Sequence, residues 1–236
     1  MLYPPAFPHD PIQEISAGVF MVRGSLRINP LLRISRNMVI LCRDGVLSLI
    51  NSVRLNEAGI AELEQLGKVQ RIIRLGSLHG LDDAWYVKRF GAEFWCQPGS
   101  QKYPLPAIDV VLNENQPLPF PNAKLFCFNS VEPESALLLE QSNGLLLTCD
   151  AIQHYGDYRH MSLLARIILP FIGFPKTTIV GPMWLKAMTP VSGSLLDDFE
   201  RLLALDFDSL LSAHGSFLRT GARGAAQTAI SRAFPA

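Results

Sequence analysis

The stretch VQRIIRLGSLHGLDDAWYVKRFGAEFWCQ, residues 69–97, carries a complete strand–loop–helix–strand pattern. Its apolar start predicts a buried strand, and Asp82 or Asp83 can begin a helix that runs to Phe90. The letters AEFWCQ predict the next strand. Between the first strand and the helix lie His79, Asp82 and Asp83, whose side chains are of the kinds that bind metals. The loop therefore predicts a metal site, the remnant of one, or only the start of a capped helix.

Further strands and helices are predicted on both sides of this stretch. Short strands fit residues Val19–Arg23, Met38–Arg43, Val46–Ser52, Leu125–Phe128, Ala136–Glu140, Leu145–Cys149 and Ser209–Ser212. Helices fit Glu57–Leu66, about Leu195–Leu203, and a segment that starts at about Ala222. Strands come early in each half and helices follow them. This order predicts an α+β fold with two mixed sheets packed face to face and helices outside, in a single domain over residues 1–236.

The overall composition restricts the classes of protein to which the chain can belong. The chain has 236 residues, of which 48% are apolar and 18% charged, as expected for a globular protein with a sizeable core. Twenty-one basic and twenty-one acidic residues balance, so the sequence predicts no nucleic-acid partner. The proline-rich start has neither a basic nor an apolar leader region, and the four cysteines form no C-x-x-C pair. These features predict a cytoplasmic protein with reduced thiols.

The longest apolar segment is SLLARIILPFIGF, Ser162–Phe174, which Arg166 and Pro170 interrupt. A membrane span needs about 18–20 uninterrupted apolar residues, so no transmembrane span is predicted. The segment fits a buried helix, a lid over an apolar pocket, or a surface that touches lipid. The buried helix is the preferred interpretation, and the apolar character also suggests a hydrophobic ligand.

Metal-competent side chains follow three of the predicted strands. They are His79 with its neighbouring aspartates, Asp150 in LLLTCDAIQ, and His214 in LLSAHG. Loops at strand ends can converge, so these residues can build one site. Imidazole and carboxylate groups bind zinc, and also iron or manganese, and such a metal makes bound water acidic enough to attack a carbonyl or phosphoryl centre. Two further histidines, His154 and His160, follow Asp150 closely and offer additional ligands.

In order, spacing and strand context these segments resemble the metallo-β-lactamase superfamily over nearly the whole chain. NMVILCRDGVLSLINS resembles the opening hairpin, and VQRIIRLGSLHGLDD occupies the place of the His-x-His-x-Asp-His loop. LLLTCDAIQ resembles the strand that ends in the metal-bridging aspartate, and LLSAHG the strand that ends in the last histidine. The resemblance implies a four-layer αβ/βα sandwich with the site at one edge.

The four-ligand motif of that family does not fit this sequence intact. If His79 takes the place of the second histidine, Leu81 takes that of the aspartate and Asp82 that of the third histidine. If His79 takes the place of the first histidine, Asp83 becomes the aspartate, but Leu81 replaces the second histidine. The mid-chain histidine is also missing, because the matching segment reads NSVEPESALLL, and Asn51 stands where an aspartate is common.

The sequence therefore predicts a single metal ion, zinc, iron or manganese, rather than a two-metal centre. Its expected ligands are His79, Asp150 and His214, with Asp83 as a further candidate, and Asp150 and His214 are the expected catalytic residues. The predicted function is hydrolysis of an ester, thioester or phosphoester of a small molecule. The alternative is a relative without metal that acts as a binding or regulatory module. The sequence leaves a homodimer open.

Overall fold

The computed structural model describes residues 3–141 and 143–235, and its contacts divide the chain into two compact units. The first unit comprises Met1–Leu112 with His160–Ser162, and the second comprises Asn113–Arg159 with Leu163–Ala236. Within the described residues, the first unit has one sheet and the second unit has two. The single domain over residues 1–236 stays a prediction.

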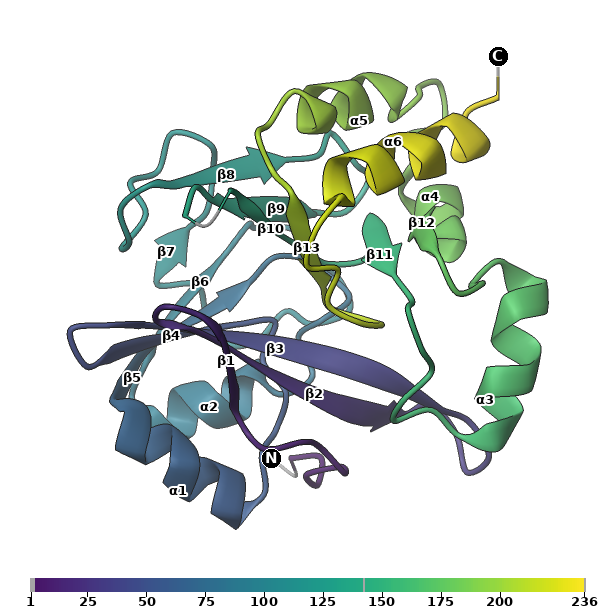
Figure 1. The fold of residues 1–236 in the computed structure, drawn as a ribbon. Helices are drawn as coiled ribbons and strands as arrows, with labels where there is room; N and C mark the ends of the chain where they lie inside the picture. The colour runs from purple at the N-terminus through teal and green to yellow at the C-terminus, as the bar shows by residue number, and fades with distance from the viewer. Residues whose placement is uncertain (1–2, 142, 236) are drawn as a thin grey trace. The chain divides into compact units, whose positions relative to one another are not determined.

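The first unit is built on a mixed seven-stranded sheet in which the strands follow sequence order. Strands β1 to β4 pair antiparallel, and β5, β6 and β7 are added parallel. The strands are β1 (Gln13–Ser16), β2 (Val19–Arg27), β3 (Arg33–Arg43), β4 (Val46–Ile50), β5 (Lys68–Arg74), β6 (Glu93–Cys96) and β7 (Val110–Val111). The helices are α1 (Glu57–Leu66) and α2 (Asp83–Phe90), which Figure 1 shows below this sheet.

The two helices close the core of the first unit. Helix α1 starts because the side chain of Asn56 accepts a 2.8 Å hydrogen bond from the Gly59 amide, and it buries Ile60 and Leu63. Helix α2 buries Tyr86, whose hydroxyl donates to the carbonyl oxygen of Val53 at 2.8 Å. These apolar side chains pack in one cluster with those of the sheet. The spacing of apolar residues therefore determines which face of each helix is buried.

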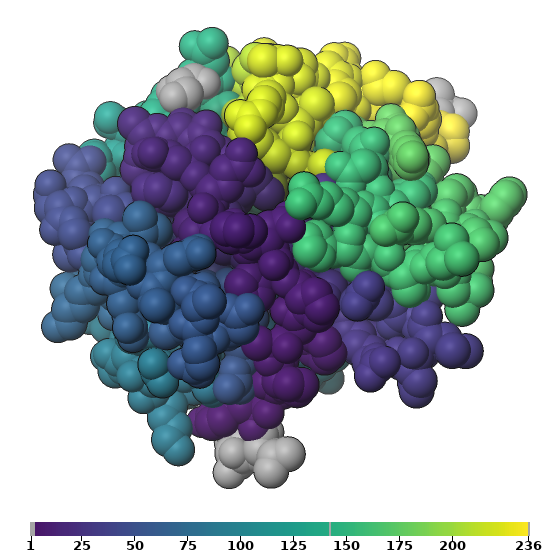
Figure 2. Space-filling model, turned by 60° about the horizontal axis from the view of Figure 1, so that its bottom comes forward, coloured from purple at the N-terminus to yellow at the C-terminus, as the bar shows by residue number. Residues whose placement is uncertain are grey.

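The N-terminal segment lies against α1, as Figure 2 shows where the purple surface meets the blue one. The Ile12 amide donates to the carboxylate of Glu62 at 3.1 Å, and the Asn56 amide donates to the His9 ring at 3.0 Å. His9 is thus engaged at the start of α1.

The second unit has a mixed four-stranded sheet in the order β13-β10-β9-β8 and a two-stranded sheet of β11 and β12. Its strands are β8 (Ala123–Cys127), β9 (Ser135–Leu139), β10 (Leu145–Thr148), β11 (Ile152–His154), β12 (Thr178–Val180) and β13 (Ser209–Ser212). Its helices are α3 (Leu163–Ile168), the short 3-10 helix η1 (Leu169–Ile172), α4 (Pro182–Met188), α5 (Leu196–Leu203) and α6 (Ala222–Ala233).

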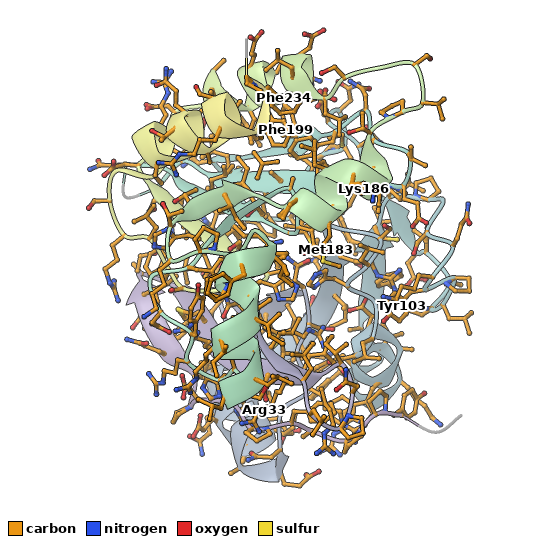
Figure 3. The ribbon with its side chains drawn as sticks, turned by 90° about the vertical axis from the view of Figure 1, so that its right-hand side faces the viewer. Arg33, Tyr103, Met183, Lys186, Phe199 and Phe234 are labelled. Atoms are coloured by element: carbon orange, nitrogen blue, oxygen red, sulfur yellow. The ribbon has the colours of Figure 1, made fainter. Side chains whose placement is uncertain are left out.

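Helices α5 and α6 lie beside each other near the four-stranded sheet (Figure 1). Figure 3 shows Phe199 of α5 next to Phe234, which follows α6, and their ring centroids are 5.6 Å apart. Phe199 also packs edge-on against Trp184 of α4 and Phe128. This aromatic cluster holds the helices together at the core of the second unit.

The buried-helix interpretation of Ser162–Phe174 is wrong for most of this segment. A helix does form, and Ala165, Leu169 and Phe174 are buried, but most of its other apolar side chains are exposed. Among the described residues, no helix is both long enough and apolar enough to cross a membrane. The sequence predicts an apolar helix, but only the tertiary structure shows that most of its apolar side chains are exposed.

Candidate metal centre

Asp150 and His214 lie together in the second unit. Asp150 follows β10 and His214 follows β13, and these two strands pair in parallel, so both residues emerge at the same edge of the sheet. Nε2 of His214 is 3.4 Å from Oδ1 of Asp150, and the two side chains are 12% and 11% exposed. The sheet register therefore brings together two residues that are 64 positions apart (214 − 150).

The spacing of this pair fits one metal ion. Two ligand atoms that each lie about 2.0–2.1 Å from a tetrahedral ion are roughly 3.3–3.4 Å apart. The separation of 3.4 Å between the carboxylate oxygen and the imidazole nitrogen matches that value. A carboxylate and an imidazole are also the donors that suit zinc, iron and manganese.

The loop that carries Asp150 is held by two buried polar residues. The carboxylate of Glu134 accepts hydrogen bonds from the amides of Asp150 and Ala151, at 2.7 and 2.9 Å. The side-chain amide of Gln153 donates to the Asp150 carboxylate at 3.1 Å, and Tyr155 in turn donates to Gln153 at 2.7 Å. Asp150 is therefore fixed through both its backbone and its side chain.

The backbone around His214 is held by a close approach. The Ser212 hydroxyl donates to the His214 carbonyl oxygen at 2.6 Å. Gly215 has a positive φ of +79°, and a Cβ at this position would overlap the carbonyl oxygen of His154. The amide of Ser216 donates to the same oxygen at 2.7 Å. Glycine after His214 thus allows the two chain segments to touch.

Glu134 is a site residue that the sequence reasoning missed. It is 1% exposed, and burial, together with the nearby charge of Asp150, raises the pKa of its carboxyl well above the ordinary range. Glu134 lies just before β9, in the segment NSVEPESALLL, where an acidic residue precedes an apolar run. That pattern was the available signal.

His154 and His160 are engaged elsewhere. Nδ1 of His154 lies 2.9 Å from the Thr178 hydroxyl, across the β11–β12 pair. Nε2 of His160 lies 2.9 Å from the carboxylate of Asp10, in the first unit. Neither contact supports a role for these two histidines as additional metal ligands.

The burial of His154 makes stability depend on pH. Burial lowers the pKa of His154 from its ordinary value, so the folded state favours the neutral ring. Below a pH of about 6.5 the unfolded chain takes up this proton first, and the free energy of unfolding is expected to fall as the pH drops. In His154→Gln this part of the decrease should be missing. Urea unfolding at pH 7.5 and 5.5 measures the free energy of unfolding of both proteins. An equal decrease between the two pH values in the unaltered chain and in His154→Gln would contradict the expectation.

In the first unit, His79 lies in the loop between β5 and α2 and is 6% exposed. Two residues earlier, the Ser77 hydroxyl is buried and has no hydrogen-bond partner among the described residues. A buried hydroxyl of this kind is normally satisfied by water or by a ligand. The loop thus combines a buried imidazole with an unpartnered polar atom.

The acidic pair of the same loop is bound to arginines. Both oxygens of Asp83 are used, since Arg74 Nε donates to one at 2.6 Å and the Ser52 hydroxyl donates to the other at 2.5 Å. Asp82 accepts from Arg36 Nη1 at 2.9 Å. The Asp83 and Arg74 side chains are 0% and 2% exposed. The structure therefore gives Asp83 a structural role.

Helix capping, the alternative for these aspartates, is correct in position only. Helix α2 begins at Asp83 with Asp82 as the preceding residue, but the Asp82 side chain makes no capping hydrogen bond. Burial raises the pKa of the Asp82 carboxyl, and the nearby Arg36 partly offsets this effect. The carboxylates pair with the arginines because an unpaired buried guanidinium costs more free energy than an uncapped helix end.

Solved metallo-β-lactamases have a similar structure over nearly their whole length. The enzyme from Hirschia baltica shares 16% identity, with 96% of this chain and 100% of that chain covered and a TM-score of 0.59. FIM-1 from Pseudomonas aeruginosa, in its mono-zinc form, shares 10% identity, with 98% of each chain covered and a TM-score of 0.62. A structure from Erythrobacter litoralis shares 10% identity, covers 93% of this chain and 90% of that chain, and has a TM-score of 0.58.

The chain has the metallo-β-lactamase fold. The α+β class predicted from the sequence, the αβ/βα sandwich of that superfamily, is thereby confirmed. No protein-family model matches the chain, and no curated protein matches it. At identities of 10–16% the similarity concerns the fold of this metallo-β-lactamase-like chain, and its chemistry has to be argued from its own residues.

Proposed function

We propose that this protein is a hydrolase that uses one divalent metal ion held by Asp150 and His214. The observation that carries the proposal is the 3.4 Å separation of the two donor atoms in a largely buried pair. Glu134 and Gln153 hold Asp150 by hydrogen bonds to its amide and its carboxylate, as partners of metal ligands commonly do. A buried and supported pair of this kind is more typical of a metal site than of a chance contact between side chains on the surface.

His79 is the proposed third ligand, because its loop resembles the metal-binding loop of the superfamily and because an imidazole nitrogen can bind a metal ion. The unpartnered Ser77 hydroxyl two residues away supports a ligand or water in this loop. Asp83 does not belong to the proposed set, because Arg74 and Ser52 occupy both its oxygens. Three protein ligands with an open fourth position are a catalytic pattern for zinc.

The chemistry of the proposed site follows from its parts. An ion bound there acts as a Lewis acid and makes water a better nucleophile near neutral pH. Asp150 and His214 would hold the ion, while Gln153 fixes the orientation of the Asp150 carboxylate through its 3.1 Å hydrogen bond. The proposed substrates are small, apolar esters, thioesters or phosphoesters. We place the protein in the cytoplasm, in accord with its four free cysteines.

Elemental analysis of protein purified without a histidine tag tests this proposal. The expected result is close to one zinc, iron or manganese per chain, after growth in supplemented medium and removal of loosely bound ions. Hydrolysis of p-nitrophenyl esters, thioesters and bis(p-nitrophenyl) phosphate should require this ion and return when it is added back to chelated protein. Less than a tenth of an ion per chain, with none taken up on addition, would reject the metal site.

A second candidate function is binding without catalysis. It is favoured by the Arg74–Asp83 and Arg36–Asp82 pairs, which occupy the loop where the four-ligand motif is expected. This alternative predicts no stoichiometric metal and no hydrolysis that depends on Asp150 or His214. The same elemental analysis separates the two candidates.

A further inference from the structure

The segment Leu163–Ile172 exposes an unusual number of apolar side chains. Among the described residues, six large apolar side chains that are exposed fall within these ten positions, and they are Leu163, Leu164, Ile167, Ile168, Phe171 and Ile172. Phe171 is 86% exposed and Leu163 is 74% exposed. Soluble surfaces carry such residues singly, so a continuous group marks a contact surface.

The segment has an anchored side and an exposed side. Ala165 and Leu169, four positions apart, are 0% and 8% exposed and therefore form the buried side of the helical turns. The exposed apolar residues recur as adjacent pairs every four positions and form the other side. Helix and 3-10 turn are thus apolar on both sides, although only one side is used for folding.

The surface continues onto α4. Gly173 at the end of η1 approaches Pro182 so closely that a Cβ would come within 2.9 Å of its ring. Met183, the next residue, is 68% exposed. Figure 3 looks onto this side of the second unit and shows Met183 and Lys186 on α4. A further apolar side chain and a cation therefore extend the same surface.

The charges near these apolar residues are almost all positive. Arg159, Arg166 and Lys176 line a hollow of about 630 Å³ together with Tyr158 and a single acid, Asp157. Lys176 lies over the Tyr158 ring, with Nζ 5.3 Å from the ring centroid. From residue 158 to residue 196 the sequence contains no aspartate or glutamate. This stretch of 39 residues (196 − 158 + 1) contains Arg159, Arg166, Lys176 and Lys186, and its net positive charge is complementary to a negatively charged surface.

We propose that Leu163–Ile172 docks the protein onto an anionic phospholipid bilayer, with the six apolar side chains entering the interface and Arg159, Arg166 and Lys176 contacting lipid phosphates. Apolar side chains beside basic residues are the combination that binds the surface of anionic membranes. The segment is too short to span the bilayer, so the attachment is peripheral and reversible. This inference concerns location and is independent of whether a metal is bound.

Co-sedimentation with vesicles tests the proposal. The full chain is mixed with vesicles of phosphatidylcholine alone or of phosphatidylcholine with 30% phosphatidylglycerol, at low and high salt. Binding to the anionic vesicles is expected to exceed binding to the neutral ones at least tenfold and to weaken with salt. Equal binding to both kinds of vesicle, or binding to neither, would overturn the proposal.

Three double variants locate the contact. Ile167→Ser with Phe171→Ser should reduce binding to anionic vesicles at least tenfold, and Arg166→Glu with Lys176→Glu should abolish the preference for them. Val131→Ser with Val191→Ser is the control, because these apolar side chains are 59% and 108% exposed outside the segment. The control should bind like the unaltered chain, and thermal unfolding verifies that each variant is folded. Undiminished binding in both test variants would overturn the proposal.

The same surface could instead pair two copies of the chain. Sedimentation velocity without lipid distinguishes this outcome. A dimer that Ile167→Ser with Phe171→Ser converts to a monomer, in a chain that does not bind anionic vesicles, would assign the surface to self-association and reject the lipid contact. A monomer that binds anionic vesicles supports the proposal.

Discussion

Replacing Arg74 with alanine is expected to lower the free energy of unfolding by about 3–5 kcal/mol. Arg74 pairs with Asp83 and also donates to the carbonyl oxygens of Tyr103 and Leu105, at 2.8 and 2.9 Å. Its removal leaves the fully buried carboxylate of Asp83 with only the Ser52 hydroxyl among these partners. An uncompensated buried charge is among the most costly defects that a single substitution can create.

Urea unfolding followed by circular dichroism measures this effect. Lys124→Ala is the matched control, because it breaks an ion pair with Glu140 whose side chains are 63% and 39% exposed, and should cost less than about 1 kcal/mol. Arg74→Met combined with Asp83→Leu should recover a large part of the loss, since it removes both buried charges. If Arg74→Ala is as stable as the control, the pair is not the structural centre of its loop. Should Arg74→Ala fail to fold, the double variant still tests the argument.

The second large effect concerns metal affinity. His214→Ala is expected to weaken binding of the proposed ion by at least about 100-fold, because loss of a ligand costs more than the 10–100-fold loss typical of a supporting residue. Asp150→Asn should act similarly, since the amide carries no negative charge. Gln153→Ala should weaken ion binding by about 10–100-fold, because it removes only the 3.1 Å hydrogen bond that orients Asp150.

Competition against a chromophoric chelator measures these affinities. His160→Ala is the matched control, since it also removes a histidine, but one whose ring is bound to Asp10. His79→Ala tests the proposed third ligand in the same series. Ion binding that stays within about twofold in His214→Ala and Asp150→Asn would exclude this pair as the metal site. A wild-type hydrolysis rate that persists in both variants would exclude the proposed chemistry.

The sequence predicts the regular elements well where the signals are local. Helix α1 and strand β13 have the predicted bounds, because α1 has a clear apolar period that ends at Gly67 and β13 is a short run of two leucines between two serines. Strands β11 and β12, of three residues each, were not predicted. Their pairing joins segments that are far apart along the chain, and three residues are too few to show a period.

The candidate site could be predicted only in part for the same reason. Asp150 and His214 stand out because a polar residue directly follows an apolar strand. Glu134 has only the weaker signal of an acid ahead of an apolar strand, and Gln153 has none, since their roles depend on which backbone and side-chain groups the fold places beside them. The sequence does not indicate a role for Arg36 and Arg74, because arginine is rarely buried, whereas both are buried and paired inside the first unit.

The arginine pairs also set a condition for anyone who would rebuild a second metal site in this scaffold. If histidines were introduced in the loop between β5 and α2 and Asp82 and Asp83 were turned toward a metal, Arg36 and Arg74 would remain buried without their counterions. Two stranded guanidinium groups would destabilise the loop and repel an incoming dication. A successful redesign has to exchange the arginines together with the aspartates, as one cooperative unit, before any new ligand can be useful.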